Sequence, residues 1–144
     1  MHDILEYHKE VYRKIIHICS SLIAMLLWLI GKDVLLPWIT SIAFLFPILD
    51  YSRKYIPHLQ KLYFTLFGIV TRPYEHQNLS GASWVFIGAG TTIYLFNEKV
   101  AIIALLVMSL SDSAAALIGI KYGKTRLFNK SLEGSMAFLI TTYV

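Results

Sequence analysis

Apolar residues gather along the chain in four long runs separated by polar connections, at residues 15–30, 34–49, 79–96 and 100–120. A membrane-spanning helix needs about 20 mostly apolar residues, with about 17 as a practical minimum. Each run therefore predicts a span, provided that flanking polar side chains reach back to the interface. A fifth run begins at Met136 and has nine residues, about 14 Å of helix. We expect an all-α fold, a polytopic transmembrane helical bundle with four complete spans plus a truncated fifth.

The connection at residues 51–78 mixes basic residues with aromatic ones. That composition is typical of a segment that lies in the membrane interface, and it predicts an amphipathic helix around residues 59–70. We expect residues 1–144 to form a single membrane-embedded domain. Because the fifth run is too short to cross a bilayer, we also expect the chain to be the N-terminal part of a longer protein.

Composition supports a membrane protein. Hydrophobic residues make up 56% of the chain and charged residues only 15%, and the mean hydropathy is +0.58. Soluble domains carry about 25% charged residues, so this chain has too little polar surface to be one. A single cysteine excludes a disulfide framework and a cysteine-built zinc site.

Basic residues are distributed unevenly between the connections. The N-terminal segment and the second and fourth connections hold eleven Lys and Arg residues, whereas Lys32 and Lys99 are the two on the first and third connections. The positive-inside rule makes the rich side cytoplasmic, so we expect an integral, multi-pass protein whose active site faces the cytoplasm. The host membrane would be a bacterial or archaeal inner membrane, or the ER or a plastid membrane in a eukaryote. The net charge of +4 does not predict nucleic-acid binding, because the chain has no basic arm and no interleaved aromatic platform that would bind bases.

Asp112 lies inside the fourth apolar run. A carboxylate within a membrane span is costly and usually functional. Ser109, Ala115, Ala116 and Gly119 share its helical face, and such small residues allow another helix or a ligand to approach closely. The alternative is a structural carboxylate paired with an arginine.

A second cluster precedes the first run. Glu10, Arg13, Lys14 and His17 fall at i, i+3, i+4 and i+7, which is one face of a helix. Two cations beside a carboxylate and an imidazole suit a polyphosphate, although Arg13 and Lys14 alone could simply flank a span.

The fourth connection combines glycines with Lys121, Lys124, Arg126 and Lys130. Residues 119–125 come within one residue of the phosphate-loop pattern, but a membrane helix precedes them where that loop requires a strand.

Two further charged pairs lie next to predicted spans. Asp50 and Arg53 follow the second run, and this pair is as consistent with a structural role as with a site. Arg72 and Glu75 precede the third run.

Four motifs then appear in order: Glu10-x-x-Arg13-Lys14-x-x-His17; Arg72-x-x-Glu75 with Leu79-Ser-Gly-Ala82; Ser111-Asp112-Ser-Ala-Ala-Ala-Leu-Ile-Gly119 with Gly123-Lys124; and Lys130-Ser-Leu-Glu133-Gly134. Together they resemble the polyprenol kinase family, which includes dolichol kinase, phytol kinase and CTP-dependent diacylglycerol kinase. Residues 112–134 also resemble the cytidylyltransferases that make CDP-diacylglycerol.

The resemblance implies an integral membrane kinase that transfers the γ-phosphoryl group of CTP, or of another nucleoside triphosphate, to a polyprenol, dolichol, phytol or diacylglycerol alcohol. Its important residues fall on Arg13, Lys14, Asp112 and Gly119, together with Lys130 and Glu133. Phosphoryl transfer needs Mg²⁺ and basic groups that neutralise charge. Mg²⁺ favours one or two carboxylates with phosphate oxygens and water.

We therefore expect Asp112 and Glu133 to bind Mg²⁺. Arg13, Lys14, Gly119, Lys124 and Lys130 are the expected nucleotide-binding residues. His17, Glu75 or Asp112 would accept the proton of the alcohol. The alternatives are a CTP-dependent phosphatidate cytidylyltransferase, which attacks the α-phosphate, and a non-enzymatic membrane carrier or scaffold.

Overall fold

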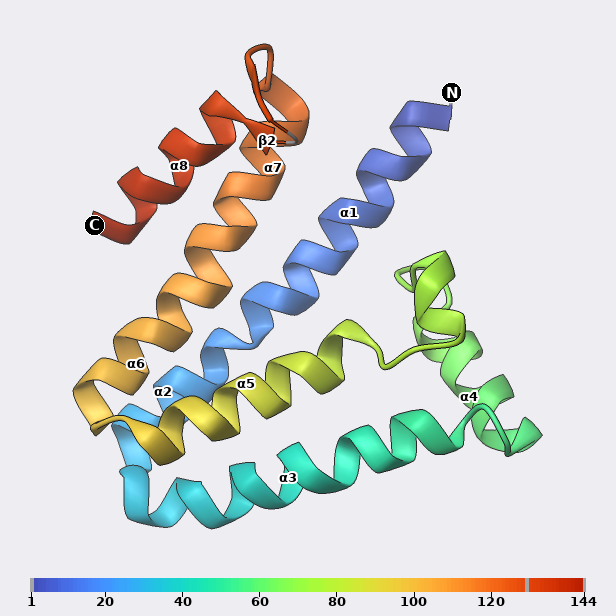
Figure 1. Ribbon diagram of the computed structural model, residues 1–144, viewed down its shortest axis with the longest axis vertical. Coiled ribbons are helices and arrows are strands. Elements are labelled where there is room, and N and C mark those ends of the chain that lie inside the picture. Colours follow the sequence, from blue (N-terminus) through green and yellow to red (C-terminus); the bar gives the residue numbers. More distant parts are fainter. Residues whose placement is uncertain (1, 129, 144) are drawn as a thin grey trace. The chain divides into compact units, whose positions relative to one another are not determined.

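A computed structural model describes residues 2–128 and 130–143, and these are predominantly helical (Figure 1). The helices, in chain order, are α1 (His2–Cys19), α2 (Ser21–Ile30), α3 (Lys32–Ser52), α4 (Pro57–Phe67), the 3₁₀ helix η1 (Pro73–His76), α5 (Gly81–Leu95), α6 (Glu98–Leu106), the π-helix η2 (Val107–Ser111), α7 (Asp112–Tyr122) and α8 (Leu132–Tyr143). Two short strands, β1 (Arg126–Leu127) and β2 (Lys130–Ser131), pair antiparallel between α7 and α8.

Three helical stretches are long and apolar enough to cross a membrane: Tyr7–Ile30, Lys32–Ser52 and Glu98–Tyr122. They contain the apolar runs at residues 15–30, 34–49 and 100–120, which confirms that those runs form helices of membrane-spanning length. Many large apolar side chains on them are exposed, and Trp28 and Phe44 each keep 70% of their surface accessible. Such surfaces suit lipid, since they do not pack into a core.

The run at residues 79–96 forms a shorter helix. α5 has 15 residues, about 22 Å at 1.5 Å per residue, and it begins only at Gly81. The preceding residue, Ser80, is held outside the helix because its backbone N–H donates to Asp50 Oδ2 at 2.6 Å. Length and composition therefore support three spanning helices, and the fourth span and the truncated fifth stay predictions.

The chain divides into two compact units. Unit 1 comprises the residues up to 25 and those from 102 onward, and unit 2 comprises Leu26–Ala101. Each unit is described by itself below. The expected single membrane-embedded domain stays a prediction.

Unit 2 is built on the pairing of α3 with α5 (Figure 1). Its core contains Ile39, Ala89 and Ile93, which are almost fully buried. The helix predicted around residues 59–70 is confirmed as α4, which runs from Pro57 to Phe67. It starts earlier than predicted because proline is well suited to the first turn of a helix. Its location in the membrane interface stays a prediction.

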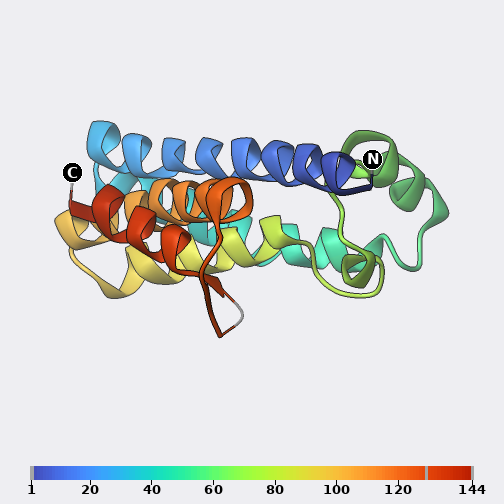
Figure 2. The same cartoon turned by 90° about the horizontal axis from the view of Figure 1, so that it is seen from above.

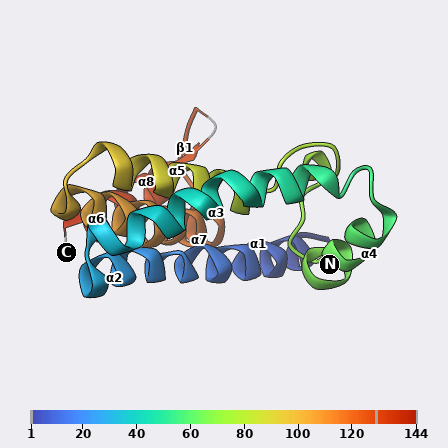
Figure 3. The same ribbon diagram turned by 90° about the horizontal axis from the view of Figure 1, so that it is seen from below.

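Unit 1 pairs α7 with α8 (Figure 2) and α1 with α7 (Figure 3). α7 and α8 approach closely where two glycines meet. A Cβ added to Gly134 would lie 2.7 Å from the Ala115 carbonyl oxygen and 3.1 Å from the Gly119 Cα. Gly119 and Gly134 therefore have a packing reason to be glycine.

Candidate active site

The centre of the candidate site is Asp112, at the start of α7. Lys14 Nζ lies 2.6 Å from Asp112 Oδ2, and His17 Nε2 lies 3.6 Å from the same oxygen. The packing of α1 against α7 thus brings together residues that are almost one hundred positions apart. The Asp112 side chain is 53% exposed, whereas those of Lys14 and His17 are 14% and 21% exposed. The carboxylate is therefore accessible while its two basic neighbours are held in place.

A π-helix lies directly before Asp112. η2 (Val107–Ser111) leaves the regular helical hydrogen-bond pattern, and the His17 Nε2–H donates to the Met108 carbonyl at 3.0 Å. Single-turn π-helices inside α-helices occur frequently at functional sites. With Nε2 used in this bond, a neutral His17 keeps Nδ1 as its proton-accepting nitrogen.

The remaining charges on α1 form a second pair. Arg13 and Glu10 make a salt bridge within the helix, and Arg13 Nε is buried with no hydrogen-bond partner in the described part of the chain. The expected shared face is confirmed for Lys14 and His17, which reach one carboxylate oxygen. Arg13 keeps an unused donor beside them along the helix.

The connection between α7 and α8 is organised by Glu133. Its Oε1 and Oε2 accept the Thr125 backbone N–H at 3.1 and 3.4 Å. Hydrogen bonds from its own backbone amide and from that of Thr125 lower the pKa of Glu133 below its usual value. Lys124 and Lys130 are exposed on the same connection.

These residues lie away from Asp112 along α7. Gly119 follows Asp112 by seven positions, about 10 Å of helix, and packs at the end of α8 that carries Glu133. Asp112 and Glu133 make no contact with each other. Within residues 2–128 and 130–143, no group of three or more His, Cys, Asp or Glu side chains could hold a metal ion. A magnesium ion would therefore depend on Asp112 with phosphate oxygens and water, a ligand set that Mg²⁺ accepts.

An apolar cavity accompanies the same two helices. It has a volume of about 420 Å³ and is lined mainly by apolar side chains of α7 and α8, with Glu133 among its lining residues. A cavity of this size and character can take part of an acyl or prenyl chain.

Glu75, the third candidate base, belongs to unit 2 and is 8% exposed. Its Oε2 accepts the Arg72 backbone N–H at 3.4 Å, and its carbonyl oxygen accepts Arg53 Nη2 at 2.5 Å. Both contacts fix the turn that leads into α5.

Asp50 and Arg53 form a buried ion pair, which favours the structural alternative. Arg53 Nε lies 2.9 Å from Asp50 Oδ1, and the two residues are 3% and 6% exposed. Asp50 Oδ2 accepts the Ser83 hydroxyl and the Ser80 backbone N–H, each at 2.6 Å. Sequence reasoning singled out the two charges and missed these serine partners, for which the serine at each end of Ser80-Gly-Ala-Ser83 was the available signal.

Comparison with known proteins adds the family. The chain is 36% identical over 141 residues to the CTP-dependent diacylglycerol kinase 1 of Saccharomyces cerevisiae, covering 94% of this chain and 48% of that protein. It is 27% identical over 143 residues to the phytol kinase of a Synechocystis strain, covering 94% and 56% of the two chains. The chain belongs to the polyprenol kinase family.

The chain is also 31% identical over 142 residues to an uncharacterised protein of Rickettsia prowazekii. That alignment covers 94% of this chain and 68% of that protein. The chain spans about half the length of the curated kinases that it matches. No family model and no solved structure matches it. The expected likeness to CDP-diacylglycerol-forming cytidylyltransferases stays a prediction.

Proposed function

We propose that this protein is a membrane lipid kinase that transfers the γ-phosphoryl group of CTP to the hydroxyl of a lipid alcohol of the polyprenol, phytol or diacylglycerol type. The observation that carries the proposal is the cluster of Asp112, Lys14 and His17 on a membrane-length helix pair. A half-exposed carboxylate flanked by two basic groups can serve both a metal ion and a polyphosphate. The relatives named as CTP-dependent and phytol kinases give the donor and acceptor classes.

Asp112 is the residue best suited to hold Mg²⁺, which would neutralise phosphate charge and orient the triphosphate. Within the described residues its Oδ1 accepts no hydrogen bond, so one oxygen is available without breaking the Lys14 contact. Glu133, the second expected ligand, lies at the other end of α7 and would need the nucleotide to bridge the two. We retain it as a candidate for the ribose or base end of the nucleotide site.

The bound nucleotide would lie along α7, where basic side chains can contact its phosphates. Lys14 can exchange its contact with Asp112 for a phosphate oxygen, and Arg13 can offer its unused Nε. Gly119 lies about 10 Å further along the helix, and Lys124 and Lys130 follow it on the connection to α8. An extended nucleoside triphosphate can cover the distance from Asp112 to Gly119. The 420 Å³ cavity beside α7 and α8 would take the apolar chain of the acceptor.

In the reaction, the alcohol oxygen forms a bond to the γ-phosphorus while the bond between that phosphorus and the β–γ bridging oxygen breaks. CDP leaves with the bridging oxygen, and the alcohol proton passes to a base. Asp112 and His17 Nδ1 are the better candidates for this base. Glu75 is the weaker one, because it is buried and already accepts a backbone hydrogen bond.

We also propose four complete spans with a truncated fifth, and a cytoplasmic active site. α3 and α5 are tied at both ends: Lys32 Nζ donates to the Phe96 carbonyl at 2.7 Å, and Ser80 donates to Asp50 at 2.6 Å. Lys32 and Asp50 are 18 positions apart, about 27 Å of helix, close to the hydrocarbon thickness of about 30 Å. α5 with its flanking residues therefore extends along nearly the whole of a span.

The test is a labelling assay on the full-length protein in membranes. CTP labelled at the γ- or the α-phosphate, and γ-labelled ATP, are supplied with Mg²⁺ and a panel of prenols, phytol and diacylglycerol. We expect γ-label, and no α-label, in the lipid product. Transfer of α-label to phosphatidate would instead identify a cytidylyltransferase, and no nucleotide consumption would favour a carrier or scaffold.

A further inference from the structure

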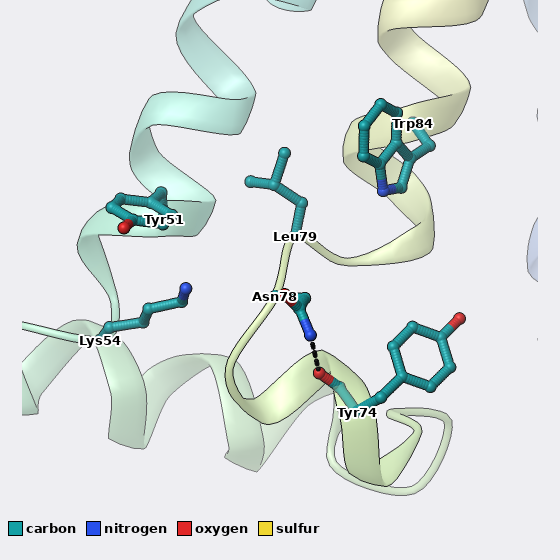
Figure 4. Close-up of a pocket in the computed structure, with 6 residues that line it drawn as sticks. All are labelled: Tyr51, Lys54, Tyr74, Asn78, Leu79 and Trp84. Carbon is teal, nitrogen blue, oxygen red and sulfur yellow. Dashed lines mark hydrogen bonds between the residues drawn. The ribbon is translucent and has the colours of Figure 1, made fainter.

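Unit 2 contains a cavity that the proposed reaction does not use. It has a volume of about 430 Å³ and lies between the end of α3 and the beginning of α5 (Figure 4). Its lining residues are Tyr51, Lys54, Tyr74, Asn78, Leu79 and Trp84. α3 is long and apolar enough to cross a membrane, and Lys54 lies two residues beyond its last residue, Ser52. If α3 spans the bilayer, the cavity lies at the level of the lipid headgroups.

The polar groups around the cavity are mainly hydrogen-bond donors. The Lys54 ammonium lies 4.0 Å from the centre of the Tyr51 ring and points toward the space beside Leu79 (Figure 4). Within the described residues no carboxylate pairs with Lys54, and none lines the cavity. Asn78 Nδ2 uses one N–H on the Tyr74 carbonyl at 2.9 Å and keeps the other. The indole N–H of Trp84 adds a further donor, whereas the Tyr51 and Tyr74 phenol oxygens accept hydrogen bonds from Tyr55 and Arg72.

The walls of the cavity are held by the buried Asp50–Arg53 pair. Arg53 Nη2 donates to the carbonyl oxygen of Asn78 at 3.0 Å, and the Ser80 N–H that follows Leu79 is bound by Asp50. The Arg53 guanidinium also lies 3.8 Å from the centre of the Tyr63 ring. A buried ion pair whose hydrogen bonds reach the backbone on both sides of Leu79 fixes the position of that wall before any ligand arrives.

We propose that this cavity binds the phosphate group of a membrane lipid, with Lys54 as the cation that recognises it. A set of donors without a carboxylate selects a ligand rich in acceptors and negative charge, which a phosphate provides. The apolar surfaces of Leu79, Trp84 and the tyrosine rings favour a phosphate attached to an acyl chain over a free phosphate ion. Tyrosine and tryptophan are typical of this depth in the membrane.

The experiment uses tryptophan fluorescence. Trp28→Phe and Trp38→Phe leave Trp84 as the single reporter among the three tryptophans of the chain. The full-length protein in detergent is titrated with dihexanoyl phosphatidic acid, with dihexanoylglycerol, and with inorganic phosphate. We expect saturable binding of phosphatidic acid only.

Charge variants test the role of Lys54. Lys54→Gln should weaken phosphatidic acid binding by about tenfold or more, whereas Lys54→Arg should keep it within a few-fold. Lys61→Gln, at an exposed lysine of α4, is the matched control and should change nothing. Equal binding of dihexanoylglycerol, an unaffected Lys54→Gln variant or the lack of any saturable signal would overturn the proposal. Saturation by inorganic phosphate at the same concentration would replace the lipid with a free anion.

Phosphatidic acid would also be the product of the proposed kinase acting on diacylglycerol, so the two sites are separated by the reporter. Trp84 lines the cavity of unit 2, and the assay contains no nucleotide. The Asp112→Asn variant should bind phosphatidic acid as tightly as the unsubstituted protein. A lipid site could therefore be established even if the enzyme assay failed, and the reverse also holds.

Discussion

Asp112 combines two properties that rarely occur together. It lies within a 25-residue helical stretch of membrane-spanning character, yet its side chain is 53% exposed and contacts Lys14. The buried pair of Asp50 and Arg53 offers no accessible oxygen to a ligand, whereas the carboxylate of Asp112 does. This accessibility is what the proposed role of Asp112 as a metal ligand requires.

Asp112→Asn tests this directly. Asparagine keeps the shape and the hydrogen-bonding capacity but lacks the charge that a metal ion or a base requires. We expect lipid phosphorylation to fall by about 10²-fold or more, with folded yield nearly unchanged. Turnover with γ-labelled CTP at varied Mg²⁺ is the measurement, and Asp33→Asn, at an exposed carboxylate of α3, is the control. Ordinary turnover with unchanged Mg²⁺ dependence would remove Asp112 from the site.

Arg13→Ala and Lys14→Ala should raise the apparent KM for nucleotide or abolish turnover. A charged hydrogen bond contributes about 1.5–3 kcal/mol, which corresponds to a change in affinity of about 10- to 150-fold. Lys9→Ala, at an exposed position of the same helix, should leave the kinetics unchanged. Should both substitutions behave like Lys9→Ala, these residues only anchor the helix at the membrane surface.

His17 can be separated into a positioning and a proton-accepting role. Glutamine can still donate a hydrogen bond to the Met108 carbonyl, but it cannot accept a proton, while phenylalanine can do neither. We expect His17→Gln to restore most of the activity that His17→Phe loses, since the observed contact supports η2. The pH profile of kcat is the second measurement. Equal loss in both variants, with a vanished pH-dependent limb, would identify His17 as the base.

At the level of helices, the contact between α7 and α8 depends on two glycines. Gly134→Ala places a Cβ against the backbone of α7, and overpacking of this kind costs about 1–3 kcal/mol. Gly88→Ala on α5 is the control, because a Cβ there meets nothing within 4 Å. We expect a clear fall in thermal stability in detergent for Gly134→Ala only. Equal melting temperatures would show that the two helices can separate freely.

η2 shows why helical detail escapes sequence patterns. The run at residues 100–120 predicts a continuous helix, and the stretch Glu98–Tyr122 is one, but apolar periodicity says nothing of a local change from α to π hydrogen bonding. That change is accompanied by a contact with His17, which lies on another helix. Only the packing of α1 against η2 and α7 reveals it.

For the molecule as a whole, the distribution of basic residues predicts its orientation in the membrane. Lys61, Arg72 and Lys124 should face the cytoplasm, and Lys32 and Lys99 the opposite side. Single cysteines at these positions, in a Cys19→Ser background, can be labelled with an impermeant thiol reagent on intact cells. Labelling of position 124 from outside would contradict this topology. The contact of Lys32 with the end of α5 agrees with its predicted position beside Lys99.

The sequence by itself determined the helical class, the three long apolar helices, the helix α4 and the family, because hydrophobic runs and local motifs depend only on neighbours along the chain. It also selected Lys14, His17 and Asp112, since charged residues near or inside apolar runs are costly wherever they fold. Tertiary structure alone decided which of these charges meet. It paired Lys14 and His17 with Asp112 and placed Glu133 near the other end of α7. It also buried Glu75 in the turn of unit 2 that leads into α5. Contacts between residues tens of positions apart follow from how helix surfaces pack, and that packing depends on shapes such as the Gly119–Gly134 approach that no linear pattern contains.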